Sequence, residues 1–246
     1  MPKCAAPVTL LLHGNPMSLP KIRLVCATRE TQESFFNNTA LGKSCKLYSF
    51  LPVLEIRLFS ENTLGLPLLY NQAINEAKNN PAILVFVHDD VHLADFFWCD
   101  HLIRGLNQFQ IIGLAGNKRR VPRQPAWAFI DEQFTWDARE NLSGVVGHGP
   151  GFPCSNISAF GPSGQAVKLL DGLLIASHSQ TLLDHGLYYD EQFDFHFYDV
   201  DFCREAEVRG VTMGTYPISV VHESGGAFGT PSWRMAYAKY LQKWGE

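Results

Sequence analysis

The chain has 246 residues, 46% of them hydrophobic and 18% charged, and a formal net charge of -4. This is the composition of a globular protein, which excludes a disordered chain, and the absence of a basic run longer than residues 118–120 excludes nucleic acid as the main partner. No apolar stretch is long enough to span a membrane, and the apolar patch at 8–12 is too short for a signal-peptide core, so we expect a cytoplasmic protein.

The first half of the chain alternates short apolar runs with segments whose apolar residues recur at helical spacing. The runs predict buried strands over residues 22–27, 54–59, 82–87 and 111–115. The segments between them predict helices over residues 32–43, 66–78 and 95–106. This alternation predicts an α/β fold, with a Rossmann-like, mostly parallel central sheet and helices on both of its faces. We expect one domain over residues 1–246, in which residues 1–21 form an N-terminal extension.

The second half has a different pattern. Residues 116–165 are rich in Gly and Pro, which predicts an irregular loop region. Beyond it we expect a strand over 167–176, extended chain over 211–222, and helices over 178–185, 198–209 and 232–244. Asp199 and Asp201 lie two residues apart at the start of the 198–209 helix, so their side chains should point in different directions. One could face a site while the other supports the scaffold.

Several polar groups lie where ligands bind in α/β proteins. The triplet His88-Asp89-Asp90 directly follows the apolar run 82–87, and ligands of open α/β sheets bind at the carboxyl ends of strands. Carboxylates beside an imidazole suit Mg²⁺ or Mn²⁺, but an acidic turn that caps the next helix is an equally good interpretation. His222, at the end of an extended run, is by itself an ordinary polar residue.

Two further groups allow alternative interpretations. Asp199 either stabilises the start of a helix or acts as a general base. Trp127, Trp136 and Trp233 either anchor loops or stack against the apolar faces of sugars.

Six segments occur in an order that resembles a known family. They are a strand that ends near Thr28-Arg29, N-T-L-G-L-P-L-L-Y-N-Q-A-I (62–74), V-F-V-H-D-D-V (85–91), D-G-L-L-I-A (171–176), Y-D-E-Q-F-D-F-H-F-Y-D-V-D-F-C-R-E-A-E-V-R-G (189–210) and H-E-S-G-G (222–226). This order resembles the GT-A-fold glycosyltransferases of the family 2-like group. The resemblance extends from about residue 22 to residue 226, and the segment 189–210 is its most specific part.

The resemblance implies a GT-A-type domain and an inverting hexosyltransferase that moves a sugar from a nucleotide-sugar donor to an acceptor hydroxyl. It implies Mn²⁺ or Mg²⁺ held by Asp90 and, late in the chain, by His222, with Asp199 as the general base. The residues that it places at the nucleotide sugar are Thr28, Arg29, Asn71, Asp89 and Asp171. The acceptor is a saccharide or a lipid-linked saccharide near residues 116–165, with peripheral membrane contact in the second case.

Two positions depart from the family's pattern. His88 stands where the family has the first acid of Asp-x-Asp, and Tyr198 stands where it has the Glu of a Glu-Asp pair. These departures leave a second hypothesis open, a non-catalytic member that binds nucleotide sugars or glycans. A weaker alternative is a metal-dependent hydrolase or nucleotidyltransferase that uses residues 88–90.

Overall fold

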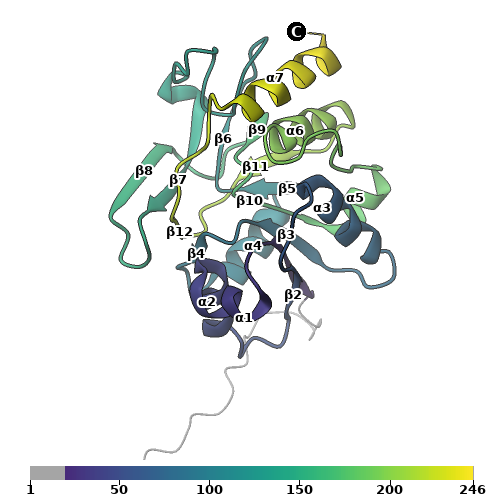
Figure 1. The fold of residues 1–246 in the computed structure, drawn as a ribbon, viewed down its shortest axis with the longest axis vertical. Coiled ribbons are helices and arrows are strands. Elements are labelled where there is room, and N and C mark those ends of the chain that lie inside the picture. Colours follow the sequence, from purple (N-terminus) through teal and green to yellow (C-terminus); the bar gives the residue numbers. More distant parts are fainter. Residues whose placement is uncertain (1–19, 246) are drawn as a thin grey trace, which may run out of the picture.

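The computed structural model describes residues 20–245, so most of the expected N-terminal extension lies outside the described residues (Figure 1). Its central sheet has six strands in the order β11-β5-β10-β3-β1-β2. They are β1 (Ile22–Ala27), β2 (Leu54–Phe59), β3 (Ile83–Val87), β5 (Ile111–Gly113), β10 (Leu174–His178) and β11 (Met213–Thr215). β10 runs antiparallel to both of its neighbours, and the other three of the five strand pairs are parallel. The mostly parallel central sheet is therefore confirmed.

The apolar run before the polar triplet forms the centre of this sheet. All five residues of β3 are buried, and β1 and β10 pair with it on either side. Full burial of such side chains contributes roughly 1.5–3 kcal/mol each relative to exposure. The helices α3 (Leu66–Glu76) and α4 (Trp98–Leu106) pack against strands of the sheet. The core thus fixes the strand whose carboxyl end presents residues 88–90.

The helix predicted over residues 32–43 is instead two helices, α1 (Gln32–Asn38) and α2 (Ala40–Leu47). They are separated by Thr39, whose backbone is extended (φ -81°, ψ 156°). Its hydroxyl oxygen accepts a hydrogen bond from the backbone N–H of Gly42 at 3.0 Å. A threonine that caps the second helix in this way interrupts the helical spacing, which the apolar periodicity alone did not reveal.

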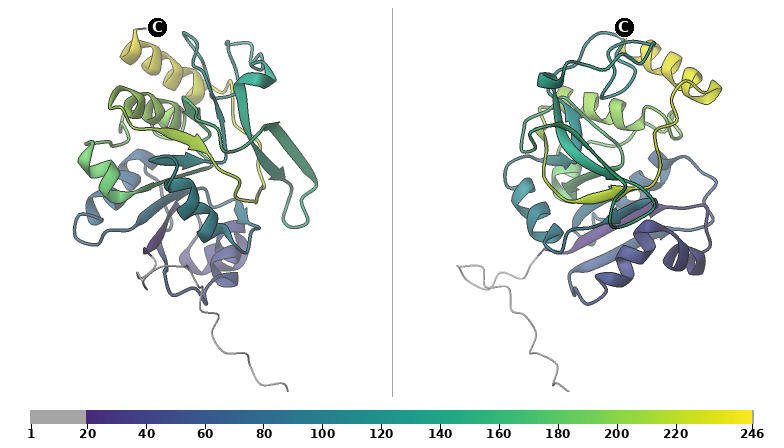
Figure 2. Two further views of the ribbon diagram at one scale, coloured as in Figure 1. Left: turned by 180° about the vertical axis from the view of Figure 1, so that it is seen from behind. Right: turned by 90° about the vertical axis from the view of Figure 1, so that its left-hand side faces the viewer.

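A second sheet packs beside the first, and the sequence did not predict it (Figure 2). Its strands are β4 (Val91–Leu93), β12 (Val220–His222), β7 (Leu142–His148), β6 (Ala115–Asn117) and β9 (Leu169–Leu170), with β8 (Asn156–Gly161) paired to β7. The prediction of an irregular region over 116–165 was wrong for the antiparallel pair β7 and β8. Likewise, the strand predicted over 167–176 is divided between β9 and β10, which belong to different sheets.

Glycine explains the wrong prediction at β7. Gly144 has φ +108°, and a Cβ atom there would collide with the carbonyl oxygen of Leu114 on the approach to β6. A residue without a side chain is therefore needed for the two strands to approach each other. The glycine content of residues 116–165, which predicted a loop, therefore in part permits close packing of strands in a sheet.

The remaining helices are α5 (Ser179–Asp184), α6 (Tyr198–Val208) and α7 (Pro231–Trp244), together with a short 3₁₀ helix at Arg139–Asn141. α7 docks on α6 through Asp201, which is fully buried. Asp201 accepts hydrogen bonds from Nζ of Lys243 (2.9 Å) and from Nε1 of Trp244 (2.8 Å). Asp201 therefore supports the scaffold. Among residues 20–245, no helix is both long and apolar enough to cross a membrane.

Candidate active site

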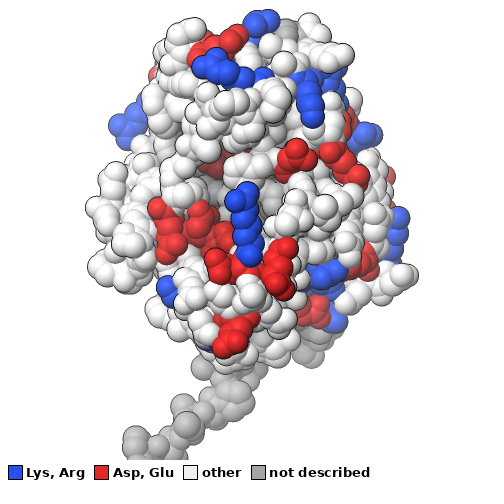
Figure 3. Space-filling model, in the orientation of Figure 1, with Lys and Arg blue, Asp and Glu red and all other residues white. Residues whose placement is uncertain are grey.

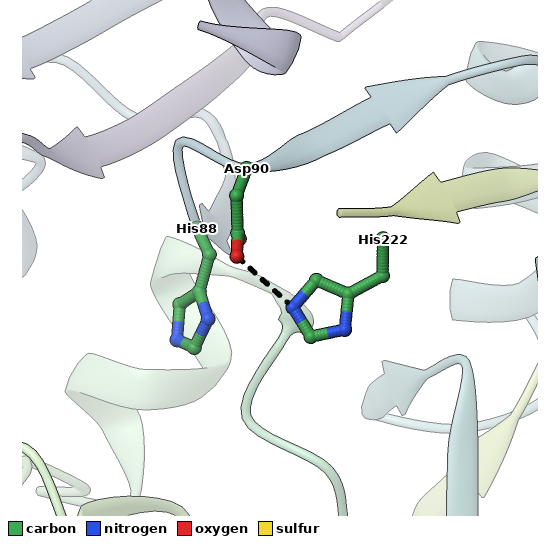
Figure 4. A group of neighbouring side chains, drawn as sticks. All are labelled: His88, Asp90 and His222. Carbon is green, nitrogen blue, oxygen red and sulfur yellow. Dashed lines mark ion pairs between the residues drawn. The ribbon is translucent and has the colours of Figure 1, made fainter. Parts of the chain in front are cut away.

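Three side chains from distant parts of the sequence meet at the carboxyl end of β3. His88 and Asp90 follow that strand, and His222 ends β12, which pairs with β4 so that His222 lies opposite Val91. One potential ligand atom from each of the three side chains lies within 4.8 Å of the others (Figure 4). Oδ2 of Asp90 is 3.3 Å from Nε2 of His222. The two predicted metal ligands, Asp90 and His222, are therefore brought together, and His88 joins them.

The protonation of this cluster suits a cation. Burial alone would raise the pKa of Asp90, but hydrogen bonds with His222 and Ser224 outweigh it and lower the pKa to about 2. The carboxylate is therefore ionised at neutral pH. Among the described residues, its Oδ1 is buried and has no hydrogen-bond partner. A buried charged oxygen without a partner is costly, and beside two imidazoles it fits a divalent metal ion.

His88 is held in one orientation by Tyr198. Nε2 of His88 lies 2.8 Å from the Tyr198 hydroxyl, which donates its proton to the carbonyl oxygen of Gly172 at 2.9 Å. The hydroxyl can therefore only accept from His88, so Nε2 carries the proton and Nδ1 keeps a free lone pair. Burial lowers the pKa of His88, which favours the neutral ring. Figure 4 shows one ring nitrogen of His88 facing Asp90 and His222, as a metal ligand would.

Acidic side chains gather near the middle of the face shown in Figure 3, over the region of β4 and β12, and a lysine or arginine side chain lies among them. A concentration of negative charge attracts cations.

Asp89 points away from the metal-ligand cluster. Its Oδ2 accepts a short hydrogen bond of 2.6 Å from the hydroxyl of Thr28, which is buried just beyond the end of β1. Arg29 follows and is exposed. Thr28 and Asp89 are thus neighbours, and their place at the nucleotide sugar stays a prediction.

Asn71 lies apart from these residues. Its Nδ2 donates to the carbonyl oxygen of Tyr189 (2.8 Å) and to Oε1 of Glu191 (3.0 Å), and its Oδ1 accepts from the N–H of Tyr189 (2.9 Å). Both amide protons are therefore used to hold the 189–191 segment against α3. These hydrogen bonds give Asn71 a positioning role, and its predicted place at the nucleotide stays a prediction.

Asp199 lies in the first turn of α6. Its Oδ2 accepts from the N–H of Gly172 (3.1 Å) and its Oδ1 from the N–H of Val200 (2.9 Å). Burial, and after it the negative charge of Asp171, raises the pKa of Asp199 to about 7. A carboxylate whose pKa lies near the working pH is suited to accept a proton from a hydroxyl group.

Asp171 lies in the turn between β9 and β10. It accepts hydrogen bonds from Nε1 of Trp127 (2.8 Å, to Oδ2) and from the backbone N–H of Leu173 (3.0 Å, to Oδ1). Both contacts hold the carboxylate in place. Asp171 thus completes a pair of acids with Asp199.

A cavity of about 590 Å³ joins two members of the metal-ligand cluster to Asp171 and Asp199. The other residues predicted at the nucleotide sugar, which are Thr28, Arg29, Asn71 and Asp89, do not line it. Its polar lining residues are His88, His148, Ser158, Asp171, His196, Asp199, His222 and Ser224, and its lining also includes the three tryptophans singled out in the sequence, Trp127, Trp136 and Trp233. The volume is within the range of small-molecule sites. The two acids of α6 therefore point in different directions, as predicted, because Asp199 lines the cavity while Asp201 is bonded to α7.

Two contributors were not predicted from the sequence as site residues. Tyr198 was treated as a departure from the family's pattern, and His148, which ends β7, was not considered. His88 was part of the candidate triplet after β3, although the comparison with the family's pattern treated it as a departure. His148 is brought beside His222 by the parallel pairing of β7 with β12, which no local pattern predicts.

Comparison with known proteins identifies the family of the chain and a similar fold. Residues 62–224 match the model of a glycosyltransferase-like family. Among solved structures, the chain resembles the crystal structure of GalNAc-T7 with UDP, GalNAc and Mn²⁺, with a TM-score of 0.51 and 12% identity over 92% of this chain and 48% of that one. A structure of A197 from STIV gives a TM-score of 0.42 and 8% identity, over 83% of this chain and 82% of that one. No curated protein matches the chain in sequence.

The match to GalNAc-T7 shows a shared fold, of GT-A type, and the chain spans about half the length of that protein. The family model covers more than half of the present chain, from the loop after β2 to the residues that follow β12. This range includes the His88–Asp90–His222 cluster and Asp199. The chain therefore belongs to this glycosyltransferase-like family.

Proposed function

We propose that the protein is an inverting, metal-dependent glycosyltransferase that moves a sugar from a nucleotide-sugar donor to an acceptor hydroxyl group. The main supporting observation is that one cavity is lined both by two members of the metal-ligand cluster, His88 and His222, and by the carboxylate of Asp199. A base and a cation site on the same space are what a direct displacement at a sugar phosphate requires.

His88, Asp90 and His222 would hold Mn²⁺ or Mg²⁺, which would neutralise the charge that develops on the departing nucleoside diphosphate. The buried Oδ1 of Asp90, which has no partner among the described residues, supports this assignment. Thr28, Arg29 and Asp89 would contact the nucleoside, since Asp89 is held by Thr28 beside the cluster. The relative with a similar fold was crystallised with UDP, GalNAc and Mn²⁺, which agrees with this class of donor.

Asp199 would act as the general base. It would take the proton of the acceptor hydroxyl while the hydroxyl oxygen forms a bond to the anomeric carbon and the bond to the diphosphate breaks. A single displacement of this kind inverts the anomeric configuration and needs no covalent enzyme intermediate. Asp171, beside Asp199, would bind the sugar and keep the pKa of the base high by its negative charge.

The test combines two variants with a product analysis. Asp199→Asn should abolish transfer and leave donor binding nearly unchanged, while Asp90→Ala should remove the effect of Mn²⁺ on donor binding in calorimetric titrations. Asp184→Asn is the matched control, because Asp184 is exposed and does not line the cavity. NMR of the product should show the inverted anomer. Full turnover by Asp199→Asn, or a retained configuration, would contradict the mechanism; donor binding without release of nucleoside diphosphate would favour a non-catalytic member.

A further inference from the structure

Three large aromatic side chains line the cavity and are nevertheless exposed. The exposed fractions are 54% for Trp136, 51% for Phe195 and 40% for Phe228. By contrast, Phe197 and Trp233 line the same cavity and are each 3% exposed, because they pack into the core. Exposed apolar area grouped in a concave site is typical of a surface that a ligand covers.

Contacts with three other aromatic rings hold the side chain of Trp136 in place. Its ring stacks on Phe160, with centroids 5.9 Å apart and an angle of 18° between the planes. Edge contacts with Phe129 (5.0 Å) and Trp127 (6.5 Å) fix it laterally. Trp136 is thus a supported aromatic plane, and its neighbour Trp127 donates the hydrogen bond that holds Asp171. Trp127 therefore links the ring of Trp136 to Asp171, one of the two acids.

Phe195 is placed beside the metal-ligand cluster. Its ring stacks on His88, with centroids 5.9 Å apart and planes 29° apart. Because its other surface is half exposed, Phe195 offers an apolar contact between the cluster and the rest of the cavity. An aromatic surface is therefore present on both the cluster side and the Trp136 side.

The charge of the cavity is the second, independent observation. Among the described residues that line it, none is a lysine or an arginine, and two are the carboxylates Asp171 and Asp199. Burial lowers the pKa of His196, so its ring adds no positive charge at neutral pH. His222 is paired with Asp90. On the Trp136 side of the cavity, away from the metal-ligand cluster, a ligand with its own negative charge would therefore find no lysine or arginine to offset the repulsion from the acids.

We propose that this aromatic part of the cavity is an acceptor subsite for a neutral saccharide, with Trp136 as the stacking plane, and that saccharides with a carboxylate or phosphate on the bound unit are rejected. The apolar face of a sugar ring fits an aromatic plane, and its hydroxyl groups match the acids as hydrogen-bond donors. The assignment as acceptor rests on the proposed function of Asp199. The binding of neutral saccharides through Trp136 does not depend on turnover.

The test uses matched pairs of probes, namely methyl hexosides and the corresponding methyl hexuronides and hexose 6-phosphates. Binding to the full chain is measured by saturation-transfer NMR, and transfer from a panel of nucleotide sugars is measured in parallel, together with donor hydrolysis without acceptor. The variants are Trp136→Ala, Trp136→Phe and, as control, Phe50→Ala. Phe50 is 71% exposed and does not line the cavity. Because Trp136 is also half exposed, both alanine variants should fold, which thermal unfolding checks.

We expect neutral hexosides to bind and to be used with a kcat/KM at least tenfold above that of their acidic counterparts. Trp136→Ala should raise the acceptor KM about tenfold, Trp136→Phe should restore most of the affinity, and Phe50→Ala should have no effect. Equal or better use of the acidic member of a pair, or an unchanged acceptor affinity in Trp136→Ala, would overturn the inference. Neutral saccharides that bind through Trp136 without any transfer or donor hydrolysis would instead contradict the proposed function while supporting the subsite.

Discussion

The hydroxyl group of Tyr198 lies 2.8 Å from Nε2 of His88 and gives its own proton to the carbonyl oxygen of Gly172. Tyr198 begins α6, and His88 follows β3. Tyr198 stands where the family has the Glu of a Glu-Asp pair, and His88 stands where it has the first acid of Asp-x-Asp. Tyr198 therefore holds His88 in place. The two departures act together, which argues against a degraded site.

Tyr198→Phe should weaken Mn²⁺ binding about tenfold, because the loss of a partner that orients a metal-binding histidine typically costs 10- to 100-fold in affinity. It should also lower the free energy of unfolding by roughly 1–3 kcal/mol, since the carbonyl of Gly172 loses its buried donor. Calorimetric titration and urea unfolding measure the two effects. Tyr188→Phe is the control, because the hydroxyl of Tyr188 makes an exposed contact with Asn75. Equal Mn²⁺ affinity in wild type and Tyr198→Phe would show that Tyr198 does not orient the ring.

The pH dependence of transfer should report Asp199. A general base must be ionised, so kcat/KM should rise with pH and level off above an apparent pKa near 7, the value to which burial and Asp171 raise it. Asp171→Asn removes the neighbouring negative charge and should shift the midpoint to lower pH. Initial rates between pH 5 and pH 9 test this shift. A midpoint that does not move in Asp171→Asn would mean that Asp171 does not act on the base through its charge.

The same ionisation should affect stability. The pKa of Asp199 is about 7 in the folded protein and about 3.9 in an unfolded chain, so folding disfavours the charged form. The contribution of Asp199 to the free energy of unfolding should therefore fall as pH rises from about 4 to about 7 and stay low above that. The free energy of unfolding of Asp199→Asn minus that of the wild type should therefore be larger at pH 8 than at pH 4. Urea unfolding at both pH values checks this, and a difference independent of pH would rule it out.

Lys243→Met should destabilise the protein by about 3 kcal/mol, because removing one partner of a buried pair leaves an uncompensated charge. Nζ of Lys243 lies 2.8 Å from both Asp190 and Asp201, and Asp201 is fully buried. Lys239→Met is the matched control on the same helix, since Lys239 is exposed. Thermal or urea unfolding measures the difference. If both substitutions had the same small effect, the docking of α7 would not depend on this ion pair.

Most of the central sheet could be predicted from the sequence because its strands are short apolar runs, and local composition is enough to identify them. β1 and β2 match the predicted bounds, and β3 differs by one residue. The second sheet could not be predicted in this way. Its strands are short or contain glycines that permit close strand approach, as at Gly144, and their partners are distant in sequence. Pairing, and not periodicity, defines them.

The site was predictable only in part, for the same reason. Their positions after a buried strand and at a helix start made Asp90 and Asp199 candidates, and the resemblance to GT-A glycosyltransferases implied their roles. The contact between Asp90 and His222 depends on the pairing of β12 with β4, which the sequence does not encode locally. His88 appeared to be a substitution that weakens the site, yet the fold brings one of its ring nitrogens within 4.8 Å of ligand atoms of Asp90 and His222. An imidazole there can take the place of a carboxylate.

The connection from β12 to α7 joins two parts of the cavity. His222 ends β12, and Ser224, Gly225, Gly226, Ala227 and Phe228 follow along the cavity rim before α7 begins at Pro231. A molecule bound at His222 and a molecule bound against Phe228 would therefore touch the same short stretch of backbone. If a donor bound at His222 fixes this stretch of backbone, the part of the cavity around Phe228 takes its shape before the acceptor binds. We accordingly expect a compulsory order of addition, with the donor first, which initial-rate and product-inhibition patterns would distinguish from random entry.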